Sequence, residues 1–345
     1  MPKIFKWTTA TGVAAVVALT VSACSATPPG GGPSGGEGHG GGEQVRVAFV
    51  PKLVGIPYFT AMQKGGEQAA KDLGVKFIYQ GPSTGDSAAQ IQVMDGLISQ
   101  HVDAIAVAPN DPAAIAPVIK RAKAAGIKVF TTDTDAPTSE RQVFVQQATD
   151  TAIGDALVDS LAEQTGGKGK WAIVSCGPTA QNLNAWIKEQ KAYTKKKYPD
   201  MELVGVKYAG EDQDKAASIA KDLMTANPDL KGLVGECTTS APGVAQAIAD
   251  AGKTGEVFST GIATPTAMEK YVKSGAMAKV VLWNPADLGY LTVWAGKQLA
   301  DGKSLNATDA GDIKGIRYQE ALRTLLLGEP LVFDKSNISQ YAGKF

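Results

Sequence analysis

The chain is poor in the residue types from which most catalytic and metal centres are built. Its 345 residues include only two histidines and three cysteines, and no CxxC pair occurs. His39 lies in a glycine tract and His101 at the end of an expected helix, so a histidine-based metal site is disfavoured. A serine or cysteine nucleophile would lack a plausible histidine base. We therefore expect no metal site and no nucleophilic catalysis.

Excess charge and phosphate-binding glycine motifs are also missing. The chain carries 34 basic and 34 acidic residues, and this balance gives no reason to expect a nucleic-acid partner. A dinucleotide site needs GxGxxG after the first strand, but residues 51–57 read PKLVGIP there. Residues 166–170 read GGKGK, yet they precede an expected strand and are interpreted as a surface turn. HExxH is absent, and the two matches to GxSxG, at residues 32–36 and 81–85, have no plausible histidine base to accompany them. The sequence therefore predicts no catalytic residues, no cofactor and no enzymatic activity.

Beyond the N-terminus, no segment is long and apolar enough to span a membrane. The N-terminus itself is basic, then apolar, and Val21-Ser22-Ala23-Cys24 resembles a bacterial lipobox. We expect residues 1–23 to be a lipoprotein signal peptide and Cys24 to carry lipid; the alternative is an ordinary signal peptide with an incidental cysteine. Gly, Pro and Ser dominate residues 24–43, which predicts a flexible tether. The protein would be exported and lie at the outer face of the cytoplasmic membrane or in the periplasm, touching the membrane only through its lipid.

Strand and helix patterns alternate through the rest of the chain. Apolar runs that read as strands occur in two sets, at 45–50, 75–79, 104–108 and 128–131, and at 171–175, 202–206, 233–235 and 257–260. Helical patterns follow the strands, which predicts an α/β protein of two doubly wound parallel-sheet lobes with a cleft between them. We expect residues 44–134 and about 264–303 in lobe 1, and residues 135–263 and about 304–345 in lobe 2. Residues 279–282 would then form a strand that returns to lobe 1.

Polar and aromatic side chains follow the expected strands, at the sheet edge where parallel sheets bind ligands. Lobe 1 and the returning strand supply Lys52, Tyr58, Phe59, Asp133, Trp283 and Asn284, and lobe 2 supplies Gln147, Asn182, Asn184, Glu236 and Thr238. The same strand ends also carry Asn110, Asp135, Gln146 and Thr239. Carboxylates, amides and a lysine can bind neighbouring hydroxyls, and aromatic faces cover C–H surfaces. Each residue alone could equally be a helix cap or a core side chain, but together they predict a site for a small neutral polyol.

Two cysteines, Cys176 and Cys237, each end an expected strand of lobe 2. In the expected strand order these strands are neighbours, about 4.8 Å apart. An exported protein permits a disulfide between them. The alternative is a pair of unpaired, buried cysteines, because bridges between adjacent strands are often strained.

Three segments resemble the type I periplasmic binding proteins of ABC importers: Val47–Gly55 (VAFVPKLVG), Lys128–Asp135 (KVFTTDTD) and Leu282–Asn284 (LWN). The resemblance extends over residues 45–345 and is nearest to the autoinducer-2- and rhamnose-binding branch. It implies two Rossmann-like lobes, a three-segment hinge and a ligand held in the closed cleft. It also implies an ABC permease and its ATPase as partners, and we expect a monomer.

The ligand residues of the autoinducer-2 receptors carry over only in part. Their lysine, aspartate and aromatic pair fall on Lys52, Asp133, Tyr58 and Phe59. Their Asp-Gln pair is replaced by Asn182-Leu183, and their proline and alanine by Glu236 and Thr238. These replacements keep or add hydrogen-bonding groups. We therefore predict a substrate-binding lipoprotein that captures a tetritol, pentitol, pentose or deoxyhexose for an ABC permease; the alternative is an autoinducer-2 or sugar receptor for a signalling partner.

Overall fold

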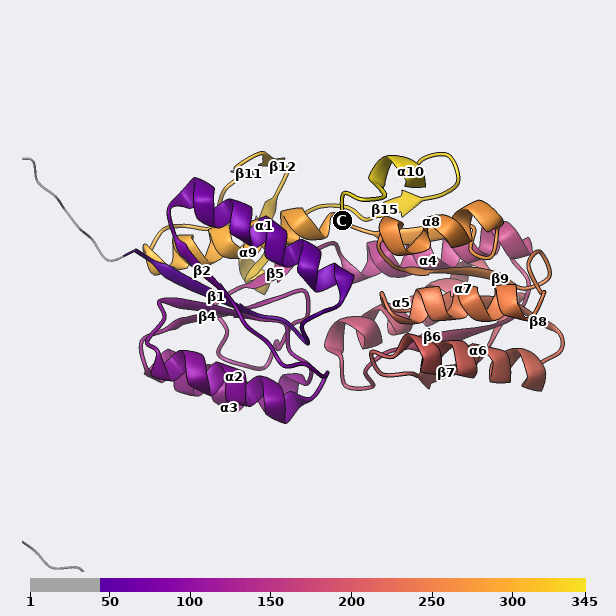
Figure 1. The fold of residues 1–345 in the computed structure, drawn as a ribbon, viewed down its shortest axis with the longest axis horizontal. Coiled ribbons are helices and arrows are strands. Elements are labelled where there is room, and N and C mark those ends of the chain that lie inside the picture. The colour runs from indigo at the N-terminus through magenta and orange to yellow at the C-terminus, as the bar shows by residue number, and fades with distance from the viewer. Residues whose placement is uncertain (1–43) are drawn as a thin grey trace, which may run out of the picture. The chain divides into compact units, whose positions relative to one another are not determined.

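The structure is a computed structural model, and it describes residues 44–345. The expected signal peptide, the lipidated Cys24 and the expected tether lie outside the described residues. The first part of the chain alternates strands and helices in the order β1 (Arg46–Val50), α1 (Pro57–Leu73), β2 (Lys76–Tyr79), α2 (Ser87–Ser99), β3 (Ala104–Val107), α3 (Pro112–Ala124) and β4 (Lys128–Thr132). All the pairs among β1 to β4 are parallel, as the strand–helix alternation predicts (Figure 1).

Local sequence explains why these elements begin and end where they do. The Asp86 carboxylate accepts a hydrogen bond from a backbone N–H of the first turn of α2, and Asp111 does the same for α3. Pro57 and Pro112 occupy the first helical turn, where a missing N–H costs nothing. Strand β3 reads AIAV and is buried throughout, because helices cover both faces of the sheet.

The second part of the chain repeats this alternation. After α4 (Asp150–Thr165) come β6 (Gly169–Ser175), α5 (Gln181–Lys197), β7 (Met201–Tyr208), α6 (Gln213–Ala226), β8 (Leu230–Gly235), α7 (Ser240–Asp250), β9 (Phe258–Ile262), α8 (Pro265–Ser274) and β10 (Lys279–Leu282). The sheet of this lobe has the strand order β15-β10-β9-β8-β6-β7, in which only β15 (Leu331–Phe333) is antiparallel. Helices α4 and α5 pack together on one side of the sheet, and α6 and α7 pack together on the other.

The first sheet is completed by strands that follow much later in the sequence. Its order is β13-β14-β5-β4-β3-β1-β2, where β5 is Phe144–Gln146, β13 is Arg317–Gln319 and β14 is Thr324–Leu326. Helix α9 (Pro285–Ala300) packs against α1, and this contact requires glycine. A Cβ on Gly289 would lie 1.9 Å from the Met62 carbonyl oxygen, and one on Gly65 would lie 1.8 Å from that of Ala286.

The chain crosses between the two sheets three times, which confirms the three-segment hinge. The crossings follow β5, β10 and β14. The remaining elements are β11 (Asp309–Ala310), β12 (Ile313–Lys314), a 3-10 helix (Glu320–Leu322) and α10 (Ile338–Tyr341). No helix within residues 44–345 is long and apolar enough to cross a membrane.

The predicted positions of the crossings were wrong. Strand β5, with Gln146, belongs to the first sheet, and β10 pairs with β9 in the second sheet instead of returning to the first. Strands β13 and β14 lie in the first sheet, whereas the whole tail was expected in the second. A short apolar run looks the same in either sheet, because its pattern reports burial and not the partner strand.

Candidate functional site

A cavity of about 40 Å³ lies between the two lobes. Its lining comprises Lys52, Ile56, Tyr58, Phe59 and Asp133 from the first lobe, and Asn182, Leu183, Trp186, Glu211, Cys237, Thr238, Ile262 and Trp283 from the second. The lining combines a lysine, two carboxylates, an amide and a hydroxyl with four aromatic rings. Such a mixture of apolar walls and a few convergent polar groups is typical of a small-molecule site.

Asp133 is the polar centre of the first lobe's contribution. It directly follows β4 and adopts a left-handed backbone with φ +63°, which is uncommon outside glycine and often marks a functional position. Its Oδ1 accepts a hydrogen bond from the Tyr58 hydroxyl at 2.7 Å, and its Oδ2 accepts one from Thr134 Oγ1 at 3.0 Å. The backbone N–H of Asp133 donates to the Val145 carbonyl, so the carboxylate is held in one orientation.

Lys52 connects the two lobes. Its Nζ lies 3.7 Å from Asp133 Oδ2 and donates to Asn182 Oδ1 at 3.0 Å. The Lys52 carbonyl accepts from Asn110 Nδ2 at 2.8 Å, so Asn110 supports the loop from outside the cavity lining. A second contact between the lobes runs from Thr179 Oγ1 to the Asn110 carbonyl at 3.1 Å. These contacts describe a closed cleft.

The aromatic wall is built from edge-to-face pairs. Tyr58 and Trp283 have ring centroids 5.8 Å apart at 89°, and Trp186 packs on Trp283 at 5.7 Å. Trp283 Nε1 donates to the Tyr58 hydroxyl, and Trp186 Nε1 donates to Asp150 Oδ1. Burial, together with the neighbouring Asp133 carboxylate, raises the pKa of Tyr58 well above its usual value. Tyr58 therefore stays neutral and donates to Asp133.

A disulfide joins Cys176 and Cys237 in the second lobe, and Cys237 lines the cavity. Their Cα atoms are 6.1 Å apart at the ends of the paired strands β6 and β8, so the alternative of two unpaired cysteines was wrong. Thr239 Oγ1 lies 3.2 Å from Cys176 Sγ and 3.4 Å from Cys237 Sγ. The same hydroxyl donates to Glu211 Oε2 at 3.2 Å, which links the disulfide to an acidic side chain of the cavity.

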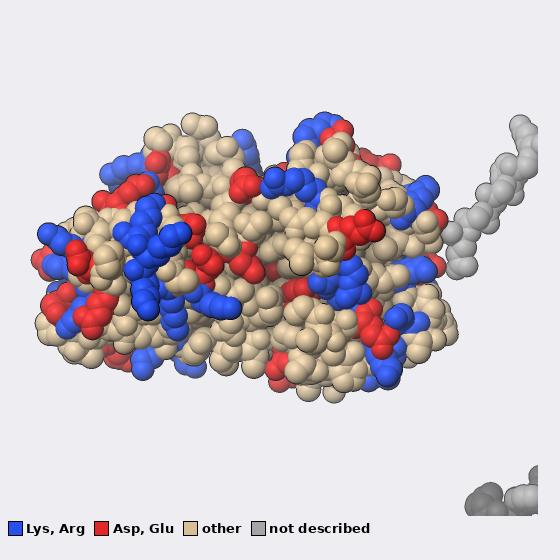
Figure 2. Space-filling view, turned by 180° about the vertical axis from the view of Figure 1, so that it is seen from behind, with Lys and Arg blue, Asp and Glu red and all other residues tan. Residues whose placement is uncertain are grey.

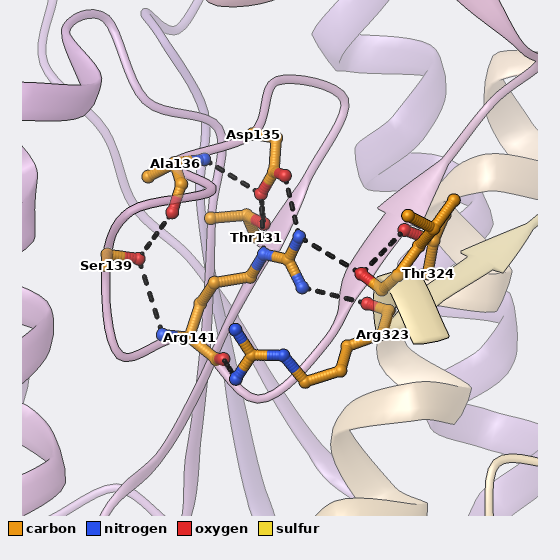
Figure 3. Close-up of polar contacts among 8 residues, drawn as sticks. Thr131, Asp135, Ala136, Ser139, Arg141, Arg323 and Thr324 are labelled. Carbon is orange, nitrogen blue, oxygen red and sulfur yellow. Dashed lines mark hydrogen bonds and ion pairs between the residues drawn. The ribbon is translucent and has the colours of Figure 1, made fainter. Parts of the chain in front are cut away.

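Asp135, which follows β4 beside Asp133, serves the fold instead of the cavity. Its carboxylate accepts from Arg141 Nε and Nη2, both at 2.7 Å, and from Thr131 Oγ1 at 2.7 Å (Figure 3). Arg141 in turn donates to the Arg323 carbonyl, and Arg323 Nη1 donates back to the Arg141 carbonyl. This buried pair ties the segment between β4 and β5 to the turn before β14.

Four residues of the predicted site lie outside the cavity lining: Gln147, Asn184, Glu236 and Asn284. Asn284 Oδ1 caps α9, and the exposed Asn184 donates to the Pro178 carbonyl. Gln147 is buried at the first crossing, where its carbonyl accepts from the backbone N–H of Gly328 in the third. Asn284 and Asn184 therefore stabilise nearby backbone, and Gln147 lies in the hinge.

Glu236 is completely buried behind the cavity. Both of its carboxylate oxygens accept from Gln190 Nε2, at 2.7 and 2.8 Å. Burial raises the pKa of Glu236 to about 8, although the hydrogen bond from Gln190 by itself lowers the pKa. Glu236 therefore points to α5, and its neighbours Cys237 and Thr238 line the cavity. The bend and turn that follow β8 decide this difference, and an end-of-strand position alone does not reveal it.

The sequence interpretation missed two polar or aromatic members of the lining, Glu211 and Trp186. Glu211 lies in the loop that follows β7, so the rule that placed Asp133 at a strand end would have selected it as well. Trp186 lies on α5, among residues that read as a helix face. Its position in the lining depends on how α5 packs across the sheet.

The matches to known proteins span both lobes. Residues 47–304 match the model of a family described as "Periplasmic binding protein domain". The D-allose-binding periplasmic protein of Escherichia coli (strain K12) is 30% identical over 253 residues, which cover 71% of this chain and 81% of the relative. The structure also resembles an ABC transporter solute-binding protein from Clostridium phytofermentas with bound L-rhamnose, with a TM-score of 0.81, 31% identity, and coverage of 88% of this chain and 99% of the other. A protein from Clostridium saccharobutylicum in complex with AI-2 gives a TM-score of 0.81 and 27% identity, with coverage of 86% and 99%.

Proposed function

Because this chain belongs to the family of periplasmic binding protein domains, we propose that it captures a small neutral polyol or monosaccharide outside the cytoplasm for an ABC importer. Members of this kind are substrate-binding proteins of transporters, and the chain is not an enzyme. The observation that carries the ligand class is the cavity itself, where the Asp133 carboxylate and Lys52 face Asn182 between aromatic walls.

The chemistry of the lining favours hydroxyl groups. A carboxylate accepts two hydroxyl hydrogen bonds at once, while an ammonium and an amide donate to the same oxygens. The faces of Tyr58, Phe59 and Trp283 cover the C–H surface of a carbon chain. The cavity is small, so it favours a ligand of one sugar unit or less over an oligosaccharide. These features support a tetritol, pentitol, pentose or deoxyhexose.

Within the cavity, we propose that Lys52, Asp133, Asn182 and Thr238 contact ligand hydroxyls. Tyr58, Phe59 and Trp283 would form the apolar wall. The other predicted residues, Gln147, Asn184, Glu236 and Asn284, are assigned no direct contact, because their side chains lie elsewhere. Ligand contacts to both lobes would stabilise the closed state, and the permease would recognise that state.

The route of delivery rests on the N-terminal segment. We propose that Cys24 carries lipid and that residues 24–43 tether a monomeric body to the outer face of the cytoplasmic membrane. An ABC permease and its ATPase would then receive the ligand from the closed protein. Mass spectrometry of the protein from membranes tests the anchor, because a lipidated Cys24 adds the mass of the acyl chains.

A thermal-shift screen tests the ligand class. The panel contains tetritols, pentitols, pentoses and deoxyhexoses, with autoinducer-2 as the probe for the signalling alternative. A ligand present at a hundred times its dissociation constant stabilises the folded state by about 2.7 kcal/mol, so binding raises the melting temperature by several degrees. Binding of autoinducer-2 in preference to every sugar and polyol would overturn the proposal and favour the signalling receptor.

A further inference from the structure

Glu211 brings a second carboxylate to the cavity, from the lobe opposite Asp133. It lies between β7 and α6, and its side chain reaches the first lobe. A Cβ added to Gly85, in the loop before α2, would lie 3.7 Å from Glu211 Cγ. The carboxylate also lies within 4.8 Å of both disulfide sulfurs. Glu211 is therefore positioned at the contact between the two lobes.

The hydrogen-bonding capacity of Glu211 is mostly unused. Within residues 44–345, the hydrogen bond from Thr239 Oγ1 to Oε2 is the one contact its carboxylate accepts. A carboxylate has room for about four hydrogen bonds, so most of its acceptor sites can receive a ligand donor. Asp135 shows the contrasting arrangement, because its buried carboxylate is fully occupied by Arg141, Thr131 and a backbone N–H.

The charges of the lining do not balance. Lys52 is the one cation among the lining residues; it forms an ion pair with Asp133, and its charge also acts on Glu211. Burial raises the pKa of Glu211 above its ordinary value; Lys52 and the hydrogen bond from Thr239 offset part of this increase, and the Asp133 carboxylate adds to it. Two carboxylates facing one ammonium leave a surplus of acceptors, so the cavity favours ligand groups that donate hydrogen bonds and repels anions.

We propose that Glu211 is a specificity-determining residue that accepts a hydrogen bond from a ligand hydroxyl and excludes ligands carrying a carboxylate at that position. The inference rests on the proposed function and narrows it to neutral hydroxyl donors, with sugar acids rejected. Thr239 and the disulfide hold the acceptor in place from the second lobe. Lys52 and Asp133 then contact the remaining hydroxyls from the first lobe.

Calorimetry with matched pairs of probes tests the role. Each pair is a sugar alcohol and the aldonate of the same carbon chain: erythritol with erythronate, ribitol with ribonate, and xylitol with xylonate. The wild-type protein should bind the alcohol of at least one pair and reject its aldonate. In Glu211→Gln the alcohol should bind about tenfold more weakly, because a charged acceptor becomes a neutral one. The aldonate should bind to Glu211→Gln no more weakly than to the wild-type protein. The ratio of the alcohol affinity to the aldonate affinity should therefore be lower in the variant.

Two further variants separate the effect of the negative charge at position 211 from the effect of side-chain length. Glu211→Asp keeps the charge on a shorter side chain, so it should still reject the aldonate while losing affinity for the alcohol. Glu202→Gln removes an exposed charge from β7 in the same lobe and should change neither affinity. Thermal unfolding of each variant without ligand verifies that it folds.

The outcomes distinguish this inference from the proposed function. An unchanged ratio in Glu211→Gln, with the wild-type protein binding an alcohol, would overturn the role of Glu211 and leave the proposed function standing. Tighter binding of an aldonate than of its alcohol by the wild-type protein would overturn it as well. Failure of every neutral sugar and alcohol to bind the wild-type protein would overturn the proposed function, and this inference with it.

Discussion

The Lys52 ammonium donates a hydrogen bond to Asn182 Oδ1 across the cleft, at 3.0 Å. The two residues are 130 positions apart in the sequence and belong to different lobes. Both are buried, with 6% and 3% of their surfaces exposed. A buried ammonium needs a partner, so this contact couples the closed arrangement of the lobes to the residues proposed to bind the ligand.

Replacing Asn182 should weaken ligand binding and favour the open state. In Asn182→Ala, Lys52 loses its partner in the second lobe, and we expect the affinity for the best-binding polyol to fall at least about tenfold. Calorimetry measures the affinity, and small-angle scattering with ligand measures closure. Asn184→Ala is the matched control, since Asn184 lies on the same helix and donates to Pro178 outside the cavity. Equal losses in both variants would contradict the assignment.

Replacing Asp133 should remove binding while the fold remains. Asp133→Asn is the sharper variant, because Asn tolerates the left-handed backbone at φ +63° and keeps the shape of the side chain. We expect its ligand affinity to fall by about tenfold or more while the protein still folds, with a lower melting temperature because Lys52 loses its ion pair. Asp133→Ala should lose binding as well and also about 1 kcal/mol of stability, because alanine is strained there. Wild-type affinity in Asp133→Asn would remove Asp133 from the ligand site.

The disulfide should be closed in the exported protein and should stabilise the second lobe. Titration of the unfolded Cys24→Ser protein should find no free thiol before reduction and two thiols afterwards. Closing a loop of 61 residues contributes on the order of 4 kcal/mol through the unfolded chain. The Cys176→Ser, Cys237→Ser double variant should therefore unfold at lower denaturant concentration. Two free thiols in the protein before reduction would contradict the bridge.

Glu236 should make stability fall as the pH rises. Its pKa in the folded protein is raised to about 8, from an ordinary value of 4.5, so folding favours its protonated form. The stabilising contribution is complete below about pH 4.5 and is lost as the pH rises through about 8, a change on the order of a few kcal/mol. Denaturant unfolding between pH 5 and pH 9 measures it.

Two variants isolate the contribution of Glu236 to this pH dependence. Glu236→Gln carries no titrating group, and we expect a flatter dependence of stability on pH and higher stability than the wild type at pH 9. Glu202→Gln, an exposed change in the same lobe, should keep the wild-type dependence. A dependence that survives unaltered in Glu236→Gln would show that other groups cause it.

Figure 2 shows basic and acidic side chains interspersed over the face of the protein seen from behind, in keeping with the formal net charge of zero. A surface of this kind gives little long-range attraction for ligands of either sign. Discrimination among ligands therefore depends on the few charges inside the cavity, and Lys52, Asp133 and Glu211 are the charged side chains of its lining in the described part of the chain.

The amino-acid sequence by itself determined most strands and helices and most polar and aromatic side chains of the cavity lining, Asn182, Thr238 and Trp283 of the second lobe included. The AIAV run of β3 and the capping residues Asp86 and Asp111 act through local propensity and burial, so their positions can be read directly. Lys52 and Asp133 were found for a similar reason. Each follows a parallel strand, and the carboxyl ends of such strands meet at one edge of the sheet.

Tertiary structure decided the rest. Strand β10 has the same pattern wherever it pairs, and its partner β9 is chosen by the packing of whole lobes. Glu236 and Glu211 both follow strands of the second lobe, yet Glu236 turns to Gln190 behind the sheet and Glu211 turns to the cavity. The direction of a side chain beyond a strand depends on the local path of the backbone and on what packs against it. Neither is encoded in residue type and spacing alone.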